Sequence, residues 1–250
     1  MIEPYFDDGD VTLYLGDMRE VIPSLELTAD LIVADPPYGE TSLAWDRWVD
    51  EWVEIAATVS RSMWCFGSMR MFLAWRDHFI GPGWKLSQDV IWEKHNGSGF
   101  AADRFKRVHE SALHWYLGDW REIYHEVPRE AYHGTNVKAV PRRTSTQHTG
   151  EIGSFEGYIG HDRLARSVMQ VRSMHGKAIH PTEKPAGILA PLIEYACPPG
   201  GLVLDPFAGS CSTLVAARLT GRRAIGIEAN EEYAEAAALR LSQATFPIGA

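Results

Sequence analysis

Two short segments of the 250-residue chain carry residue types that could do chemistry together. In the first, Asp35-Pro36-Pro37-Tyr38 follows the apolar run Leu31–Ala34. The consecutive prolines fix the backbone and remove two N–H donors, which leaves the Asp35 carboxylate and the Pro36 carbonyl as rigid acceptors beside an aromatic ring. Such acceptors can draw on both hydrogens of an amino group conjugated to a flat ring, which favours the pyramidal nitrogen whose lone pair attacks. A rigid turn after a strand is the alternative, which a bare Pro-Pro pair would favour.

The second segment, residues 205–210, has the sequence Asp-Pro-Phe-Ala-Gly-Ser and lies where an apolar run ends and a helical pattern begins. Small residues at such a turn let a ligand approach the backbone at the carboxyl edge of a sheet. Glu228 ends the next apolar run, nineteen residues after Gly209, where an acidic side chain can accept both hydroxyls of a ribose. The two features together predict a nucleoside site. A glycine-containing turn that serves only packing is the alternative.

The first segment lies among apolar runs of strand length. Each run is continuous rather than alternating, as in the strands of a parallel sheet that are buried on both faces. The stretch Trp45–Ser60 has apolar residues at helical spacing and predicts an amphipathic helix. The predicted strands are Leu31–Ala34, Met63–Phe66, Asp89–Trp92 and Ser111–Tyr116.

The C-terminal part of the chain has the pattern of a β-α-β unit with a glycine-containing first turn. A helix over Pro185–Ala196 precedes the strand Leu202–Leu204. A second helix, ending at Leu219, then precedes the strand Ala224–Ile227, and a last helix begins near Glu231. The second chemical segment therefore lies in the first turn of this unit.

The charges are unevenly distributed along the chain. A formal net charge of −9 argues at first against a nucleic-acid partner, yet residues 1–60 hold fourteen acidic residues against two arginines, so the remainder is net positive. Residues 119–176 are polar and rich in Gly, Thr, Arg and His, which predicts a loop-rich insertion, usually functional or disordered at such a length. Its basic residues could contact nucleic acid, although solvated surface charges are the alternative. The candidates are Arg142, Arg143, Arg163 and Arg166.

Several classes of protein are disfavoured by the composition. Cys65, Cys197 and Cys211 are too few and too scattered for a disulfide framework. The ten histidines lack the paired spacing of a zinc site, so we predict no metal. No apolar run approaches the roughly 18 residues of a membrane helix, and the acidic first ten residues are unlike a signal peptide. We therefore expect a cytoplasmic protein with reduced thiols.

The order of the two chemical segments resembles that of the amino-methylating DNA methyltransferases of the permuted (beta) class. In that family, Asp-Pro-Pro-Tyr precedes a Phe-x-Gly-x-Gly cofactor motif, and the target-recognition region lies between them. Four further segments resemble motifs of the family, so the resemblance covers nearly the whole chain. They are Tyr14–Met18, which includes the Asp17 that would contact the cofactor's adenine, the strand motifs Ile91–Lys94 and His109–Leu113, and His180–Pro185, which would line the cofactor's methionine portion.

The resemblance implies an α/β fold, namely the Rossmann-like fold of S-adenosylmethionine-dependent methyltransferases, circularly permuted and with a mostly parallel, doubly wound sheet. Residues 1–118 would be the catalytic part of the domain, residues 119–176 the target-recognition insertion and residues 177–250 the cofactor-binding part. The catalytic residues would be Asp35, Pro36, Pro37 and Tyr38. The cofactor-binding residues would be Asp17, Asp35, His180, Thr182, Lys184, Pro185, Asp205, Pro206, Phe207, Ala208, Gly209, Ser210, Cys211, Ser212, Glu228, Ala229 and Asn230.

The implied reaction is a direct transfer of methyl from S-adenosylmethionine to the 6-amino group of adenine in double-stranded DNA, with the base flipped out against Tyr38. Aspartate at position 35 favours adenine, because the cytosine-amino enzymes of the family more often have serine there. The 4-amino group of cytosine is one alternative, and a methyltransferase-like nucleic-acid-binding protein without turnover is another. A homodimer and a role in restriction-modification are compatible with the resemblance, and any restriction nuclease would be a separate chain.

Cys211 departs from the family pattern, which has glycine at this position. If the position requires a positive φ, a Cβ there would cost about 1 kcal/mol or more. Enzymes that methylate carbon-5 of cytosine have their nucleophile in a Pro-Cys motif, and no Pro-Cys occurs in this sequence. We therefore interpret Cys211 as a packing residue and expect the departure to bear on cofactor affinity.

Overall fold

The computed structural model describes residues 2–43, 45–98, 103–131, 162–172 and 183–243. The chain divides into two compact units, one of residues 1–126 with 167–250 and the other of residues 127–166. The smaller unit lies within the predicted insertion, and its β7 (Arg129–Ala131) and β8 (Asp162–Leu164) pair antiparallel. Both chemical segments belong to the larger unit.

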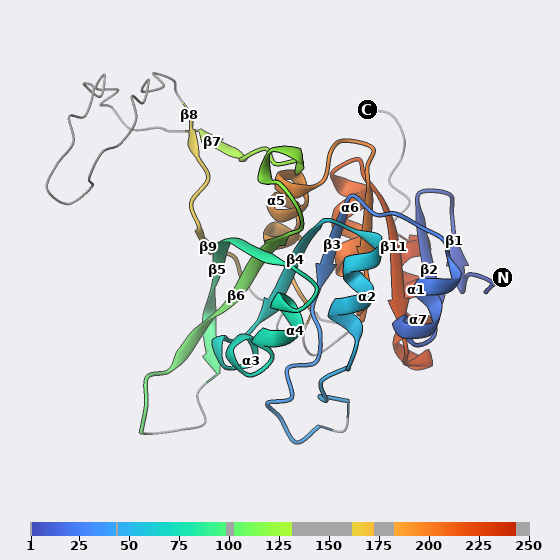
Figure 1. Ribbon diagram of the computed structural model, residues 1–250, viewed down its shortest axis with the longest axis horizontal. Coiled ribbons are helices and arrows are strands. Elements are labelled where there is room, and N and C mark those ends of the chain that lie inside the picture. The colour runs from blue at the N-terminus through green and yellow to red at the C-terminus, as the bar shows by residue number, and fades with distance from the viewer. Residues whose placement is uncertain (1, 44, 99–102, 132–161, 173–182, 244–250) are drawn as a thin grey trace, which may run out of the picture. The chain divides into compact units, whose positions relative to one another are not determined.

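Among the described residues of the larger unit, nine strands form one central sheet. In chain order, its strands are β1 (Phe6–Asp7), β2 (Val11–Leu15), β3 (Leu31–Ala34), β4 (Ser62–Gly67), β5 (Lys85–Ser98), β6 (Arg107–Tyr116), β9 (Val168–Gln170), β10 (Leu202–Asp205) and β11 (Arg223–Glu228). Their order across the sheet is β1-β2-β11-β10-β3-β4-β6-β5-β9 (Figure 1). The run from β2 to β4 in that order is entirely parallel, which confirms a mostly parallel sheet.

Two of the predicted parallel strands run antiparallel, so that part of the prediction was wrong. Asp89–Trp92 and Ser111–Tyr116 lie within β5 and β6, which pair antiparallel with each other, and β6 is also antiparallel to β4. An apolar run indicates burial but not direction. Because β5 and β6 follow each other through the short connection 99–106, the chain returns beside itself, as consecutive antiparallel strands do.

Helices cover both faces of the sheet, as in a doubly wound fold. Val33 of β3 belongs to the core on one face, whereas its neighbours Ile32 and Ala34 belong to the core on the other. On the first face lie α5 (Ala186–Ala196), α6 (Ser212–Leu219) and α7 (Glu231–Gln243). On the second lie α1 (Met18–Ser24), α2 (Trp52–Val59), α3 (Met69–Ala74) and α4 (Arg76–Ile80). A 3-10 turn, η1 (Trp120–Glu122), follows β6. None of the helices that the structure describes is long and apolar enough to cross a membrane.

The helix predicted over Trp45–Ser60 is shorter in the structure, where only α2 (Trp52–Val59) is helical. The buried Asp46 carboxylate accepts hydrogen bonds from the backbone N–H groups of Gly39, Glu40 and Thr41 at 2.6–3.0 Å. These bonds hold the chain after Tyr38 as a loop. Glu51 has a φ of 70°, a left-handed conformation that a right-handed helix cannot continue through.

Asp30 fixes the alignment of β3 with β10. Its backbone N–H donates to the carbonyl of Leu202 at 2.9 Å, and its carboxylate accepts from the N–H of Leu202 at 2.8 Å. Since β3 and β10 are parallel neighbours, the residues that follow them emerge side by side at the carboxyl edge of the sheet.

Gly226 lets α6 pack closely on β11, and a side chain there should disturb this contact. A Cβ at Gly226 would lie 2.9 Å from both methyl carbons of Leu214 and 3.0 Å from the Cβ of Ala208. We expect Gly226→Ala to lower the free energy of unfolding by about 1–3 kcal/mol, measured by urea denaturation. Gly9→Ala is the matched comparison, since a Cβ there meets nothing within 4 Å and only the positive φ opposes it. Unchanged stability in Gly226→Ala would contradict this account of the α6 packing.

Candidate active site

Four acidic side chains lie at the carboxyl ends of four neighbouring parallel strands. Across the sheet, β2 leads to Asp17, β11 ends at Glu228, β10 ends at Asp205 and β3 leads to Asp35. The two chemical segments of the sequence are therefore adjacent, as their predicted strand-end positions require. The carboxyl edge of an open α/β sheet is where such folds bind ligands.

A cavity of about 440 Å³ opens at this edge, which is within the usual size of a small-molecule site. Most of the predicted cofactor-binding residues line it, together with Pro37 of the predicted catalytic segment. The predicted residues in its wall are Asp17, Asp35, Pro37, Lys184, Asp205, Pro206, Phe207, Ala208, Gly209, Ser210, Ser212, Glu228, Ala229 and Asn230.

Four predicted site residues contribute no atoms to the cavity wall, namely Pro36, Tyr38, Pro185 and Cys211. His180 and Thr182 lie outside the described residues. The wall also includes residues that the sequence-based prediction omitted, namely Gly16, Met18, Arg19, Trp45, Val49, Glu183, Thr213, Ile227 and Tyr233. Gly16, Met18 and Glu183 lie within the motif segments Tyr14–Met18 and His180–Pro185, so counting every residue of these segments as a site residue would have included them. Trp45, Val49 and Tyr233 belong to no motif, and only the fold brings them to the site.

The carboxylate of Glu228 is fixed in position by the backbone around it. Its Oε2 accepts from the N–H of Gly209 and its Oε1 from the N–H of Asn230, both at 2.8 Å. Burial raises the pKa of Glu228 above its usual value, although these backbone hydrogen bonds act in the opposite direction. Each carboxylate oxygen keeps a further lone pair, so Glu228 can accept two hydroxyl groups of a ligand in the cavity.

Asp205 is almost fully buried at the end of β10. Its carboxylate accepts a hydrogen bond from the N–H of Phe207 at 3.0 Å. Burial raises its pKa from 3.8 to about 7, and the negative charges of Asp35 and Glu228 act in the same direction. A cationic ligand beside Asp205 would favour the ionised carboxylate and would itself be stabilised by that negative charge.

Cys211 has the left-handed backbone conformation that the glycine of the family pattern would accommodate. Its φ is 58° and ψ is 30°, at the residue that precedes α6. The side chain is fully buried, and burial raises the pKa of the thiol well above its usual value, with Asp205 and Glu228 adding to the effect. The thiol is therefore protonated and acts as a packing group.

Arg240 of α7 is a supporting residue that no sequence motif indicated. Its Nη1 donates to the carbonyl of Ser210 at 3.0 Å and lies 3.2 Å from the hydroxyl of Ser212. The same nitrogen forms an ion pair with Glu183 at 2.9 Å, and the Glu183 side chain is 2% exposed. The last helix thus ties the glycine-containing loop to the segment that carries Lys184.

Asp17 is held by the arginine two residues after it. Its carboxylate caps α1 by accepting from the N–H of Arg19, and the guanidinium Nη2 of Arg19 lies 2.6 Å from Oδ2. The hydrogen bond from the Arg19 side chain lowers the pKa of Asp17. Asp17 is consequently an ionised acceptor at the rim of the cavity.

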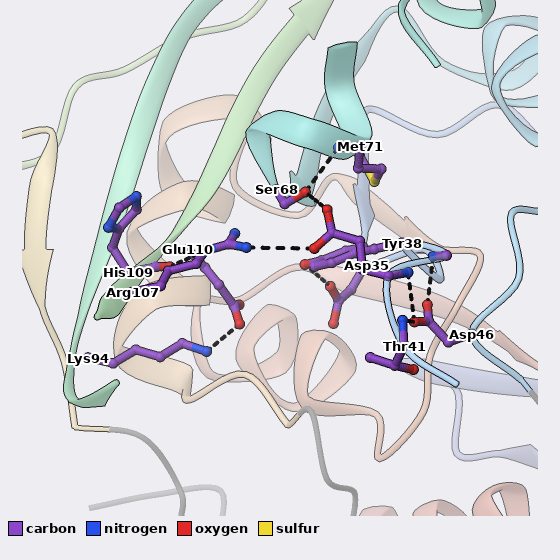
Figure 2. A network of polar contacts seen from close by, with 12 residues as sticks. Asp35, Tyr38, Thr41, Asp46, Ser68, Met71, Lys94, Arg107, His109 and Glu110 are labelled. Carbon is purple, nitrogen blue, oxygen red and sulfur yellow. Dashed lines mark hydrogen bonds and ion pairs between the residues drawn. The ribbon is translucent and has the colours of Figure 1, made fainter. Parts of the chain in front are cut away.

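Asp35 accepts a hydrogen bond at each of its carboxylate oxygens. The Tyr38 hydroxyl donates to Oδ1 at 2.9 Å (Figure 2), and the Lys184 Nζ donates to Oδ2. Burial raises the pKa of Tyr38 well above its usual value, and the charges of Asp35 and Glu110 add to this, so the phenol stays protonated. Together with the loop held by Asp46, these contacts fix the catalytic segment.

Two of the four predicted DNA-contacting arginines are described. Arg163 and Arg166 are exposed residues of the smaller unit, whereas Arg142 and Arg143 lie outside the described residues. Within the described ranges, no group of three or more His, Cys, Asp or Glu side chains is arranged to hold a metal ion.

The raised pKa of Asp205 predicts a specific dependence of stability on pH. Between about pH 4 and pH 7 the folded chain holds a proton on Asp205 that the unfolded chain has lost, so this contribution to stability is present at low pH and is lost as the pH rises through 7. At pH 8 the buried charge should cost about 4 kcal/mol relative to pH values below 4, of which about 3 kcal/mol accumulates above pH 5. Urea denaturation of the ligand-free wild type and Asp205→Asn at pH 5 and pH 8 measures this. The variant should gain stability relative to the wild type at pH 8, and an equal difference at both pH values would contradict the assignment.

Substitutions of Cys211 should reveal the strain in its backbone. Cys211→Gly should change stability by less than about 1 kcal/mol, since relief of the left-handed penalty offsets the loss of a small buried side chain. Cys211→Val should lose at least about 2 kcal/mol, because a β-branched side chain is strongly disfavoured at positive φ. Cys65→Val is the matched control, since Cys65 is equally buried but lies in the extended strand β4. If the two valine variants lost equal stability by urea denaturation, the left-handed conformation would not be the cause.

Comparison with known proteins shows the family. A model of a DNA methylase family matches residues 29–239. The type II methyltransferase M.ScaI of Streptomyces caespitosus is 26% identical over 264 residues, which cover 96% of this chain and 84% of the relative.

Two solved structures share the fold. The M1.HpyAVI–SAM complex has a TM-score of 0.65 and 24% identity, covering 92% of this chain and 99% of that one. A PvuII DNA methyltransferase described as cytosine-N4-specific has a TM-score of 0.66 and 15% identity, covering 98% of this chain and 90% of that one. These likenesses confirm the expected methyltransferase fold. The family model spans most of the sequence, so the chain belongs to the DNA methylase family whose members methylate N6 or N4 amino groups.

Proposed function

We propose that the chain transfers methyl from S-adenosylmethionine to the 6-amino group of adenine in double-stranded DNA. The observation that carries this proposal is the position of Asp35 and Asp205 at the ends of the paired parallel strands β3 and β10, in the wall of one cavity. One carboxylate can therefore face the methyl acceptor while the other faces the methyl donor. Holding two reactants at neighbouring positions removes much of the entropic barrier to their reaction.

The residues of the cavity fit this cofactor. Glu228 offers carboxylate oxygens to ribose hydroxyls, the loop 206–212 offers close approach to its backbone, and Asp17 offers an ionised acceptor. The row of acids at this edge suits a ligand with positive charge. When bound, S-adenosylmethionine supplies a methyl group on a cationic sulfur. The predicted contacts of His180 and Thr182 stay part of the proposal.

Asp35 is proposed to orient the target amine together with the Pro36 carbonyl and to offset the positive charge that develops on its nitrogen. The fixed carboxylate costs little reorganisation when this charge appears. After transfer, the alkylated nitrogen must release one proton, which Asp35 can accept or pass to water. Tyr38 holds Asp35 through its hydroxyl while its ring is proposed to stack on the flipped base.

Adenine is proposed over cytosine because the catalytic segment begins with aspartate. The DNA would be gripped through basic residues, for which Arg142, Arg143, Arg163 and Arg166 are the candidates. The proposal is compatible with a homodimer and with a reaction in the cytoplasm. Any restriction nuclease would be a separate chain.

The test is transfer of labelled methyl from S-adenosylmethionine to unmodified duplex DNA, followed by nucleoside analysis. Wild type should yield N6-methyladenine, and Asp35→Ala should lose transfer by roughly 10²–10³-fold or more, because the carboxylate stabilises charge in the transition state. Cofactor affinity, measured by titration calorimetry, should change far less. Asp77→Ala is the control, because Asp77 is an exposed aspartate of α4.

Each other outcome has a defined meaning. If the product were N4-methylcytosine, the target base would be cytosine and not adenine. Cofactor binding without transfer to any DNA would favour a methyltransferase-like nucleic-acid-binding protein. Full transfer by Asp35→Ala would remove Asp35 from the mechanism.

A further inference from the structure

A chain of buried charges extends from Asp35 away from the cavity. The Lys184 Nζ donates to Asp35 Oδ2 and lies 3.4 Å from Oε2 of Glu110. Glu110 lies on β6, and its other oxygen, Oε1, accepts from Lys94 of β5 (Figure 2). The side chain of Lys184 is 7% exposed. Two carboxylates and two ammonium groups thus alternate within a largely buried space.

Lys184 stays charged in this environment. Burial by itself would lower its pKa, but Asp35 and Glu110 more than offset this, so the pKa is raised. For Glu110, burial would raise the pKa, but Lys184 and Lys94 reverse the direction and lower it. The Nζ of Lys184 also lies 5.1 Å from the centroid of the Phe66 ring, which favours the ammonium form.

We propose that Lys184 is a positioning residue that takes the place of the target amine on Asp35 until the base enters, and then moves to Glu110. This inference rests on the proposed function of the site. Both the ammonium of Lys184 and the exocyclic amine of a base are N–H donors that need an acceptor on the Asp35 carboxylate. Tyr38 donates to Oδ1 and Lys184 to Oδ2, so an entering amine must share Oδ2 with a full positive charge, which opposes its approach and favours displacement of Lys184.

Glu110 makes the displacement of Lys184 feasible. Moving an ammonium group away from a buried carboxylate separates two opposite charges in a low-dielectric space, which is strongly unfavourable without a second carboxylate nearby. Oε2 of Glu110 is buried and accepts no closer hydrogen bond from the described residues, so a second anionic acceptor lies within reach of Nζ. Lys94 holds Glu110 by its other oxygen and keeps Oε2 directed to Lys184.

The movement also suits the electrostatics of methyl transfer. Asp35 must offset positive charge on the alkylated nitrogen, and an ammonium bonded to the same carboxylate would oppose this. Transfer of Lys184 toward Glu110 leaves more of the Asp35 charge for the amine. In the DNA-free protein, the same lysine holds the Asp35 carboxylate in place through its hydrogen bond to Oδ2.

The first test compares Lys184→Met and Lys184→Arg with the wild type in single-turnover methyl transfer across pH 5.5–9, a range chosen around neutrality. The groups that face Asp35 are Tyr38, Lys184, Glu110, Cys65 and Asp205. Lys184→Met removes a positive charge that contacts two carboxylates, so it should move the acid limb of the profile upward by about one pH unit or more. Lys184→Arg should keep the acid limb of the wild type but react more slowly, because a guanidinium is a bulkier donor to displace.

The second test uses Glu110→Gln, which removes the anionic acceptor but retains the shape of the side chain. Here the acid limb should stay in place, while kcat/KM for DNA falls about tenfold, because the displaced ammonium loses the negative charge of its acceptor on β6. Lys85→Met is the matched control, since Lys85 is an exposed lysine bonded to the Gly118 carbonyl at the far end of β5. Its profile should match the wild type.

A readout without cofactor or DNA accompanies both tests. Urea denaturation should show Lys184→Met to be less stable than Lys184→Arg, because methionine removes the positive charge between the largely buried carboxylates of Asp35 and Glu110. A Lys184→Met profile that superposes on the wild type, or unchanged kcat/KM in Glu110→Gln, would overturn the inference. If Lys184→Met does not fold, Lys184→Arg and Glu110→Gln decide. Transfer by the wild type with unaffected variants refutes the inference alone, whereas an inactive wild type refutes the proposed function as well.

Discussion

The parallel pairing of β3 with β10 is the interaction on which the rest of the site depends. It joins a strand from the first part of the chain to one from the last part, and the hydrogen bonds of Asp30 with Leu202 set their alignment. A shift of one residue would reverse which side chains face each core and would move Asp35 away from Asp205. The neighbouring pairs β10–β11 and β11–β2 extend the same edge to Glu228 and Asp17. Catalytic geometry is thus set mainly by backbone hydrogen bonding in the centre of the sheet.

The electrostatics of the site follow from this arrangement. Parallel strands bring several acids to one edge, and the fold handles each one differently. Asp17 is paired with Arg19, Glu228 accepts backbone N–H groups, and Asp205 is buried with a pKa of about 7. Asp35 alone is connected to a second layer of charges, through Lys184 to Glu110. Such a division of roles lets one acidic edge hold a cationic ligand and also act on a neutral amine.

The sequence allowed the strand-end segments to be predicted because their signals are local. An apolar run followed by Asp-Pro-Pro-Tyr, or by small residues and a distant acid, indicates a strand end wherever it occurs, and residues 35–38 and 205–210 were found in this way. Strand direction was not local information, so β5 and β6 were wrongly expected to be parallel. The helix Trp45–Ser60 was overestimated because Asp46 stabilises a loop through backbone contacts that hydrophobic spacing does not reveal. Arg240 and Glu110 act through contacts between distant elements, which no short motif encodes.

The order of the strands has a consequence for how the protein acquires its fold during synthesis. β2 and β3 are made early, but they are separated in the sheet by β10 and β11, which are made near the end. Until those two strands leave the ribosome, the early strands have unpaired edges, a condition that favours aggregation and recruits chaperones. The two late strands must then insert between them, a pairing of high contact order that is intrinsically slow. A chain released before β10 would lack the middle of its sheet, so it could not bring the two reactants together.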